Sequence, residues 1–336
     1  MKWSFLSIPL LVAFSGLSSA AYSEQPAAEG RRSLPVLTCE HANAPTDPYI
    51  GWADKDSGAF LLRCLLFADR TGVAFQITYR SPQAGESDPG SVIGGGWGTD
   101  FDDFARGESG GQVVIRNGAD GSLDTYAARR RGSPLLVVGN SADQRARRGQ
   151  ACEYVEHEGL AGLRRAFCDR TIQHFGEDGR LVGYSTHALH QMFELNWAED
   201  GPVTVTGEKP VLTVTGTRPD GQTIFTSLRR GARRATVTDQ DGRAVILEFD
   251  GSGQLARARS SAGESYAFAY DDGRRLVSVT FPDGRAQTMV YDGEGRISTI
   301  EARNGGGVCF TYGWNETEVI EQAADGSQSR TVVKFR

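Results

Sequence analysis

Apolar segments are scarce in this chain of 336 residues. Hydrophobic residues make up only 39% of it, and after residue 20 no stretch is apolar enough to span a membrane as a helix. The 36 Lys and Arg residues are outnumbered by 42 Asp and Glu residues, which excludes a wholly basic nucleic-acid-binding protein. The 42 glycines indicate many turns and argue against a helical bundle.

The first 20 residues have the pattern of a secretory signal peptide. Lys2 provides the positive start, Phe5–Phe14 is mostly apolar but too short to span a bilayer, and Ser18–Ala20 offers small residues for cleavage. We expect residues 1–20 to be removed on export and the polar residues 21–35 to form a flexible leader. The sequence therefore predicts a periplasmic, secreted or cell-surface protein that does not span the membrane.

Export gives meaning to the five cysteines, because oxidising compartments permit disulfide bonds. Cys39 and Cys64 flank one segment, and Cys152 and Cys168 flank another. We favour these two local pairs, although the sequence does not distinguish them from the other possible pairings. Cys309 is then left over, and we expect a buried free thiol there.

The C-terminal half repeats with a period of 21 residues. The first three aromatic residues of this series are each followed by an Asp that leads into a Gly-containing turn, whereas Gly313 replaces the Asp after the fourth. The residues that define this ladder are Phe249, Tyr270, Tyr291 and Tyr312, with Asp271, Asp292, Gly273 and Gly295 in the turns. A second series of turns keeps the same period at Asp220-Gly221, Asp241-Gly242, Ala262-Gly263, Asp283-Gly284, Asn304-Gly305 and Asp325-Gly326.

Two turns in every period leave two strands of about seven residues each, which predicts a series of hairpins. The Asp-Gly pairs favour two-residue type I′ turns, since both central positions of such turns need a positive φ. The strands alternate between apolar and mixed positions, as in Val245-Leu247-Phe249 and Tyr266-Phe268-Tyr270. We therefore predict an all-β fold, an open curved antiparallel sheet, in which the ladder tyrosines are structural and buried. The alternative, an aromatic row that stacks sugars, requires exposed rings.

These repeats resemble those of the RHS/YD-repeat family. The segments Phe268–Leu276 and Met289–Ile297 fit the tyrosine–aspartate turn of that family, and Phe281–Arg285 resembles its second turn. The match is specific across residues 210–330, while Ile77–Ser81, Gly95–Trp97 and Asp120–Tyr126 are similar to the domain that precedes the repeats. The resemblance implies a β-shell, which in the family often encloses a C-terminal toxin, and an association with carbohydrate binding and cell surfaces.

The chain departs from that family at its C-terminal end. No Asp-Pro-x-Gly motif, which marks self-cleavage in the family, stands there, and only ten residues follow Asp325-Gly326. We therefore expect an open shell without cargo or toxin domain. The expected domains are an N-terminal β module over residues 36–170 and the repeat shell over residues 171–336. A short helix is expected only at Glu158–Arg165.

Catalytic and metal sites are not expected. His187 and His190 invite a zinc site with His174 or Glu194, but in a strand the two histidines face opposite sides, which leaves too few ligands. The cluster at residues 100, 102 and 103 contains three aspartates that resemble a carboxylate pair for glycoside hydrolysis, although solvated loop acids explain them more simply. We therefore predict no cofactor, no metal and no enzymatic activity.

Arginine clusters are the candidate binding residues. Arg229, Arg230, Arg233 and Arg234 form a possible patch for an anionic ligand such as a glycan or a lipopolysaccharide phosphate, against the simpler interpretation of exposed loop charge. We predict an exported, non-catalytic envelope or surface protein that binds a glycan or another envelope component and does not bind nucleic acid. The alternative is an accessory shell component of an RHS-type toxin-delivery system that contacts a secreted protein, with possible self-association through edge strands. A hydrolase is the third and weakest reading.

Overall fold

The computed structural model describes residues 51–53, 57–68, 74–81, 91–99, 101–108, 112–118, 123–128, 135–140, 151–157, 160–167, 171–186, 191–197, 209–217 and 223–334. All secondary-structure elements in these ranges are β-strands, arranged in antiparallel sheets. The predicted all-β class is therefore confirmed. The signal peptide and the leader lie outside the described residues.

A small sheet is formed by the N-terminal part of the described chain. It contains β1 (Trp52–Ala53), β2 (Phe60–Ala68), β3 (Ala74–Arg80) and β4 (Trp97–Thr99), each antiparallel to the next. Apolar residues alternate with polar ones in β3, whereas β2 is apolar at every position except Arg63, and its residues 60, 62, 64 and 66 are fully buried. We call this element the inner sheet.

The remaining strands form one long meander in which each strand is antiparallel to its neighbour in sequence. No ladder joins β25 to β5 among the described residues, so the sheet is open at that point. We call this sheet the shell. Its strands are β5 (Phe104–Glu108), β6 (Gln112–Arg116), β7 (Leu123–Ala128), β8 (Leu135–Asn140), β9 (Ala151–His157), β10 (Leu160–Ala166), β11 (Ile172–Phe175), β12 (Leu181–Thr186), β13 (Gln191–Trp197), β14 (Lys209–Thr217), β15 (Thr223–Arg230), β16 (Arg234–Asp239), β17 (Ala244–Phe249), β18 (Leu255–Ser260), β19 (Ser265–Tyr270), β20 (Leu276–Thr280), β21 (Ala286–Tyr291), β22 (Ile297–Glu301), β23 (Gly307–Tyr312), β24 (Glu316–Gln322) and β25 (Gln328–Lys334).

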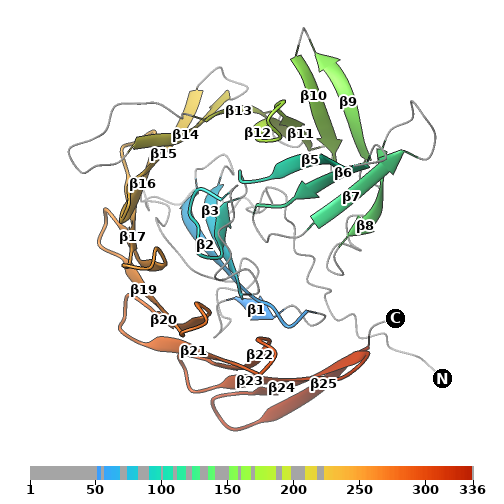
Figure 1. Cartoon of the computed structure of the whole chain (residues 1–336). Helices are drawn as coiled ribbons and strands as arrows, with labels where there is room; N and C mark the ends of the chain where they lie inside the picture. The colour runs from blue at the N-terminus through green and yellow to red at the C-terminus, as the bar shows by residue number, and fades with distance from the viewer. Residues whose placement is uncertain are drawn as a thin grey trace, which may run out of the picture.

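The shell curves around the inner sheet, as Figure 1 shows. β13 to β25 sweep past one side of β1 to β4, and β5 to β10 lie on the other side. One continuous apolar cluster joins the inner sheet to the concave face of the shell, from Phe60 and Ile77 to Leu247 and Val279. The concave face of the shell is therefore filled by the chain's own N-terminal strands.

The turns of the repeats differ from the sequence prediction. The Asp- and Gly-containing turns of the repeats close with three-residue loops, so the prediction of two-residue type I′ turns is wrong, whereas the turns at Gly231–Arg234 and Gly313–Glu316 are shorter. In one such loop the N–H of Asp250 donates to the carbonyl of Gln254 at 2.9 Å, and the N–H of Gly253 donates back to Asp250 at 3.2 Å. Only the last loop residue, Gly253, has a positive φ, of 85°. This is a type I turn followed by a left-handed residue, the usual three-residue hairpin.

The sequence of the second turn series explains the difference. In the loop between Phe281 and Arg285, Pro282 occupies the first position, and its ring fixes φ near −65°, which a type I′ turn does not permit. Gly284, at φ 82°, takes the left-handed position. One loop departs from the rule, because Arg274 at φ 62° takes the left-handed position that glycine occupies in the other repeats.

Two further predictions concern the region around β10: a short helix and a domain boundary. The expected short helix is wrong, because Leu160–Ala166 forms the strand β10, which pairs with β9 and β11. The expected domain boundary at 170/171 falls between β10 and β11, where Leu163 lies opposite Phe175 in one continuous sheet. The antiparallel pairing of successive strands thus continues across the expected boundary without interruption.

Candidate functional site

The ladder tyrosines tie neighbouring strands of the shell together. Each hydroxyl donates to a backbone carbonyl 15 residues earlier, at 2.8 Å for Tyr270, 2.9 Å for Tyr291 and 2.7 Å for Tyr312. Burial raises the pKa of Tyr270 and of Tyr291 well above the ordinary tyrosine value. The rings are half-buried, and Phe249, which has no hydroxyl, is 5% exposed. This geometry suits a structural ladder and leaves no open row of rings for sugars.

The aspartates of the repeats hold their turns closed. Asp292 accepts the backbone N–H of Arg296 at 2.9 Å through Oδ1 and its guanidinium Nε at 2.8 Å through Oδ2. Burial acts to raise the pKa of Asp292, but these hydrogen bonds outweigh it and lower the pKa below its usual value. The Arg296 guanidinium also lies 4.6 Å from the centre of the Tyr312 ring. Asp271 and Arg275 repeat the arrangement, so each turn is linked to the tyrosine of the next repeat.

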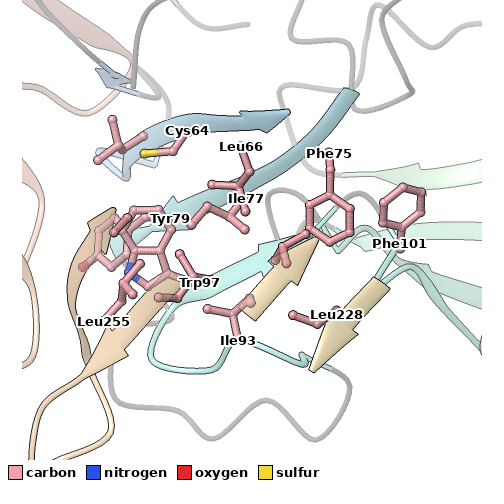
Figure 2. Close-up of a cluster of buried hydrophobic side chains, with 14 of the residues drawn as sticks. Cys64, Leu66, Phe75, Ile77, Tyr79, Ile93, Trp97, Phe101, Leu228 and Leu255 are labelled. Atoms are coloured by element: carbon pink, nitrogen blue, oxygen red, sulfur yellow. The ribbon is translucent and has the colours of Figure 1, made fainter. Parts of the chain in front are cut away.

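Two aromatic residues of the inner sheet dock on this ladder. The indole N–H of Trp97 donates to the hydroxyl of Tyr270 at 2.8 Å, and the hydroxyl of Tyr79 accepts the backbone N–H of Leu276 at 2.9 Å. The Trp97 ring lies 5.1 Å from that of Phe268, edge to face. Figure 2 shows Tyr79 and Trp97 next to each other, with Leu255 of the shell beside them. The inner sheet is thus fixed to the shell by directional contacts as well as by apolar packing.

A buried polar cluster lies inside the curve of β5 to β12. Its centre is Arg165, which is fully buried and forms an ion pair with Asp124. Its Nε donates to the Tyr126 hydroxyl at 2.8 Å, and Nη1 donates to Asn117 at 2.9 Å. Asp103 is 3.6 Å from the same guanidinium. A charge at this depth needs such partners, so the cluster serves the core of the shell.

The carboxylates considered for hydrolysis belong to this buried region. Asp103 accepts the backbone N–H of Gly118 at 2.7 Å and the side-chain amide of Gln173 at 2.7 Å. Asp102 accepts the backbone N–H of Thr99 at 2.9 Å, and burial raises its pKa to about 7. The interpretation of these two residues as solvated loop acids is therefore wrong. Asp100 lies outside the described residues.

The four predicted patch arginines do not form one surface. Arg230 points to the core side, where its guanidinium lies 3.4 Å from the centre of the Phe249 ring, and burial lowers its pKa to about 10. Arg229 and Arg234 lie on the opposite face, since their cross-strand partners, Thr236 and Glu248, alternate with buried residues. Arg233 is exposed in the turn between the strands. Three of the four arginines therefore share the outer surface.

The cysteines are partly described. Cys64 is buried in β2 and disulfide-bonded. Cys39 and Cys168 lie outside the described residues, and the side chain of Cys152 is not described, so the two predicted pairings stay predictions. Cys309 is a free thiol, but it is exposed on β23, and the expectation of a buried thiol is wrong. Its neighbour Val308 takes the core position of that strand.

The candidate zinc ligands are only partly within the described chain. His187 and His190 lie outside it. His174 in β11 and Glu194 in β13 lie on one face, because both stand opposite Gly183 of the strand between them. The described residues contain no group of three potential metal ligands. They also contain no helix with the length and apolar character needed to cross a membrane.

The C-terminal end of the shell carries an exposed aromatic residue and an edge strand. In the turn after β23 the repeat motif is replaced, and Trp314 is 100% exposed. β25 pairs with β24 on one side, and the described residues form no ladder on its other side. Glu316, two residues from Trp314, lies opposite Lys334 of β25, so the tryptophan and the end of the edge strand are neighbours.

Comparison with known proteins identifies the repeats. The family profile described as RHS Repeat matches residues 249–286, which contain β18 to β20 and the Tyr270–Asp271 pair. No curated protein matches the chain. Among solved structures, the wild-type TCP10 domain of Danio rerio CPAP, in complex with a peptide of Danio rerio STIL, is 14% identical over 69% of this chain and 99% of that one, with a TM-score of 0.16. The profile match thus identifies RHS-type repeats over residues 249–286, in agreement with the resemblance of the Tyr–Asp turns to those of the RHS/YD-repeat family.

Proposed function

We propose that this chain is an exported, non-catalytic envelope or surface protein that binds a glycan or another envelope component on its outer side. RHS-type repeats point to an envelope- or surface-associated protein. The observation that carries the proposal is the docking of Trp97 on Tyr270 within the concave face. Because the inner sheet occupies that face, a ligand must approach the shell from outside or along its rims.

The buried acids support a non-catalytic role. A glycosidase needs two carboxyl groups on either side of a cleft that admits the sugar. Asp103 is instead bound by Gly118 and Gln173, and it lies beside Arg165. Asp102 is likewise buried. These carboxylates act as structural ligands of the core.

The proposal is tested by titrating the purified protein with isolated envelope glycans, including peptidoglycan fragments and lipopolysaccharide, by calorimetry. We expect saturable binding to at least one of them and no release of reducing sugar during long incubation. The absence of saturable binding to every glycan would end the ligand part of the proposal. Turnover of a bound glycan would end the non-catalytic part.

A second candidate function is supported by the C-terminal end of the shell. In this role, the chain is an accessory component of an RHS-type toxin-delivery system and contacts a secreted protein. An edge strand with free backbone groups can pair with a strand of a partner, and a fully exposed Trp314 beside it can supply an apolar anchor. Cross-linking of the tagged protein in whole cells, followed by mass spectrometry, distinguishes the two. Stoichiometric recovery of one secreted protein, lost in Trp314→Ala, favours the second candidate.

A further inference from the structure

Four arginines from three strands come together on the convex side of the shell. Arg234 of β16 lies opposite Glu248 of β17, which in turn lies opposite Arg257 of β18. In the neighbouring row, Arg229 of β15 lies opposite Thr236, and Arg259 of β18 lies opposite Ile246. We call Arg229, Arg234, Arg257 and Arg259 the outer arginine patch. Arg257 and Arg259 stand apart from the other two in the sequence, so only the fold joins them.

The alternation of the strands fixes the direction of these side chains. Leu228, Ala235 and Ala258, which adjoin patch residues in sequence, are at most 1% exposed and face the inner sheet. Since successive residues of a strand point to opposite faces, the four arginines project outward. Arg257 and Arg259 are exposed, and Arg229 and Arg234 are half-buried.

The strand spacing sets the dimensions of the patch. Neighbouring strands are about 4.8 Å apart, so Arg234 and Arg257, two strands apart, are separated by about 10 Å at the backbone. Arg229 and Arg259 are three strands apart, which corresponds to about 14 Å. The two rows are separated by about 7 Å along the strands. The patch is therefore a flat, extended array rather than a pocket for one small anion.

The positive charge of the patch is only partly neutralised. Glu248 is the one carboxylate on the outer face of β15 to β18 among the described side chains, and it pairs with Arg259 at 3.2 Å. Arg229 and Arg257 form no ion pair with a described residue. By contrast, Arg275 and Arg296 elsewhere in the repeats are each bound by the aspartate of their own turn. Arg229 and Arg257 therefore contribute positive charge that no described carboxylate neutralises, on a chain whose net charge is −6.

We infer that the outer arginine patch binds an anionic polysaccharide through its sulfate, phosphate or carboxylate groups. This inference rests on the proposed function and names the ligand class and its site. Guanidinium groups bind such anions through two parallel hydrogen bonds, and several guanidinium groups in a plane suit a polymer with repeated charges. Among the described side chains on the outer face of β15 to β18, Ile246 is the one large apolar residue, and it is half-buried, so these side chains offer little to insert into a lipid surface.

The test compares two double variants with the same change of charge. Arg257→Gln with Arg259→Gln removes half of the patch, and Arg285→Gln with Arg330→Gln removes two exposed arginines outside it. Binding of the purified proteins to dextran sulfate and to neutral dextran is measured by calorimetry at two salt concentrations. We expect the wild-type protein to bind only the sulfated polymer, and more weakly at high salt. Each lost patch arginine should weaken binding about tenfold, while the control variant stays within about twofold of wild type.

Several outcomes would overturn the inference. Equal weakening in both double variants means that net charge, not the patch, attracts the polymer. Unchanged binding in the patch variant means that the polymer binds elsewhere, although the proposed glycan-binding function then survives. Vesicles of equal parts phosphatidylglycerol and phosphatidylcholine and a single-stranded DNA are tested in parallel. Patch-dependent binding to either of these, without binding to dextran sulfate, assigns the patch to a lipid surface or a nucleic acid instead.

Discussion

Replacing Asp102 by asparagine tests the electrostatics of the loop that joins the inner sheet to the shell. Asp102 is 2% exposed, and burial raises the pKa of its carboxyl from 3.8 to about 7. Its Oδ2 accepts the backbone N–H of Thr99 at 2.9 Å, whereas Oδ1 has no hydrogen-bond partner among the described residues. An amide of the same shape keeps the acceptor for Thr99 and removes the cost of ionising a buried group.

The size of the effect follows from the pKa difference between the folded and unfolded states. Between these two pKa values the folded protein keeps the Asp102 proton while the unfolded chain releases it, so the free energy of unfolding falls as the pH rises. The difference of about three units, at about 1.4 kcal/mol for each unit, corresponds to a loss of about 4 kcal/mol. Above about pH 7 both states are ionised, and this group causes no further change.

The measurement is the free energy of unfolding in urea for wild type and Asp102→Asn from about pH 4 to about pH 8. We expect the two proteins to be similar near pH 4 and the variant to be more stable by up to about 4 kcal/mol near pH 8. Carboxylates such as Asp283 and Asp325, whose pKa values are lowered by hydrogen bonds, act in the opposite sense but cancel in the difference. Asp272→Asn, at an exposed turn, is the control for the loss of one carboxylate, and the gain in stability toward pH 8 should be specific to Asp102→Asn. A constant difference for Asp102→Asn would refute the reasoning.

Three further changes test the repeats. Tyr291→Phe removes the hydroxyl that donates to the Leu276 carbonyl, and thermal unfolding should show a loss of about 1 kcal/mol. Gly295→Ala places a side chain at φ 79° and should cost about 1–2 kcal/mol, whereas Gly251→Ala, outside the left-handed region and in open space, should cost much less; equal costs would contradict the assigned turn geometry. Cys309 should react rapidly with a thiol reagent in the native protein, and this reaction should be lost in Cys309→Ser; protection of Cys309 until unfolding would contradict its exposure.

The repeats could be predicted because their signal is local. The spacing of Tyr270, Tyr291 and Tyr312 predicted consecutive hairpins, and the structure places each tyrosine at the end of a strand. The turn type was missed because an Asp-Gly pair suits both two-residue and three-residue loops. Pro282 carried the missing signal, since a proline at the first loop position is compatible only with the type I geometry that the structure adopts.

The buried polar cluster was missed because its members are far apart in the sequence. Arg165 and Asp124 are separated by 41 residues, and Gln173 and Asp103 by 70. Each of these residues looks like an ordinary surface residue in its own segment. Only the curvature of β5 to β12 brings them to one place. The same limit explains why Asp103 was interpreted as a solvated acid.

The docking of the inner sheet decides which parts of the molecule remain available for function. The hydroxyl of Tyr270 donates to the Leu255 carbonyl and accepts from the Trp97 indole, so one side chain belongs both to the ladder and to the contact between the sheets. Residues on the concave face are therefore constrained by two sets of contacts, and a ligand there would have to displace the inner sheet. Residues on the convex face, such as Arg257 and Arg259, take part neither in the tyrosine ladder nor in the contact between the two sheets. Their chemistry can vary without disturbing the fold, which makes the convex face the surface where recognition is to be sought.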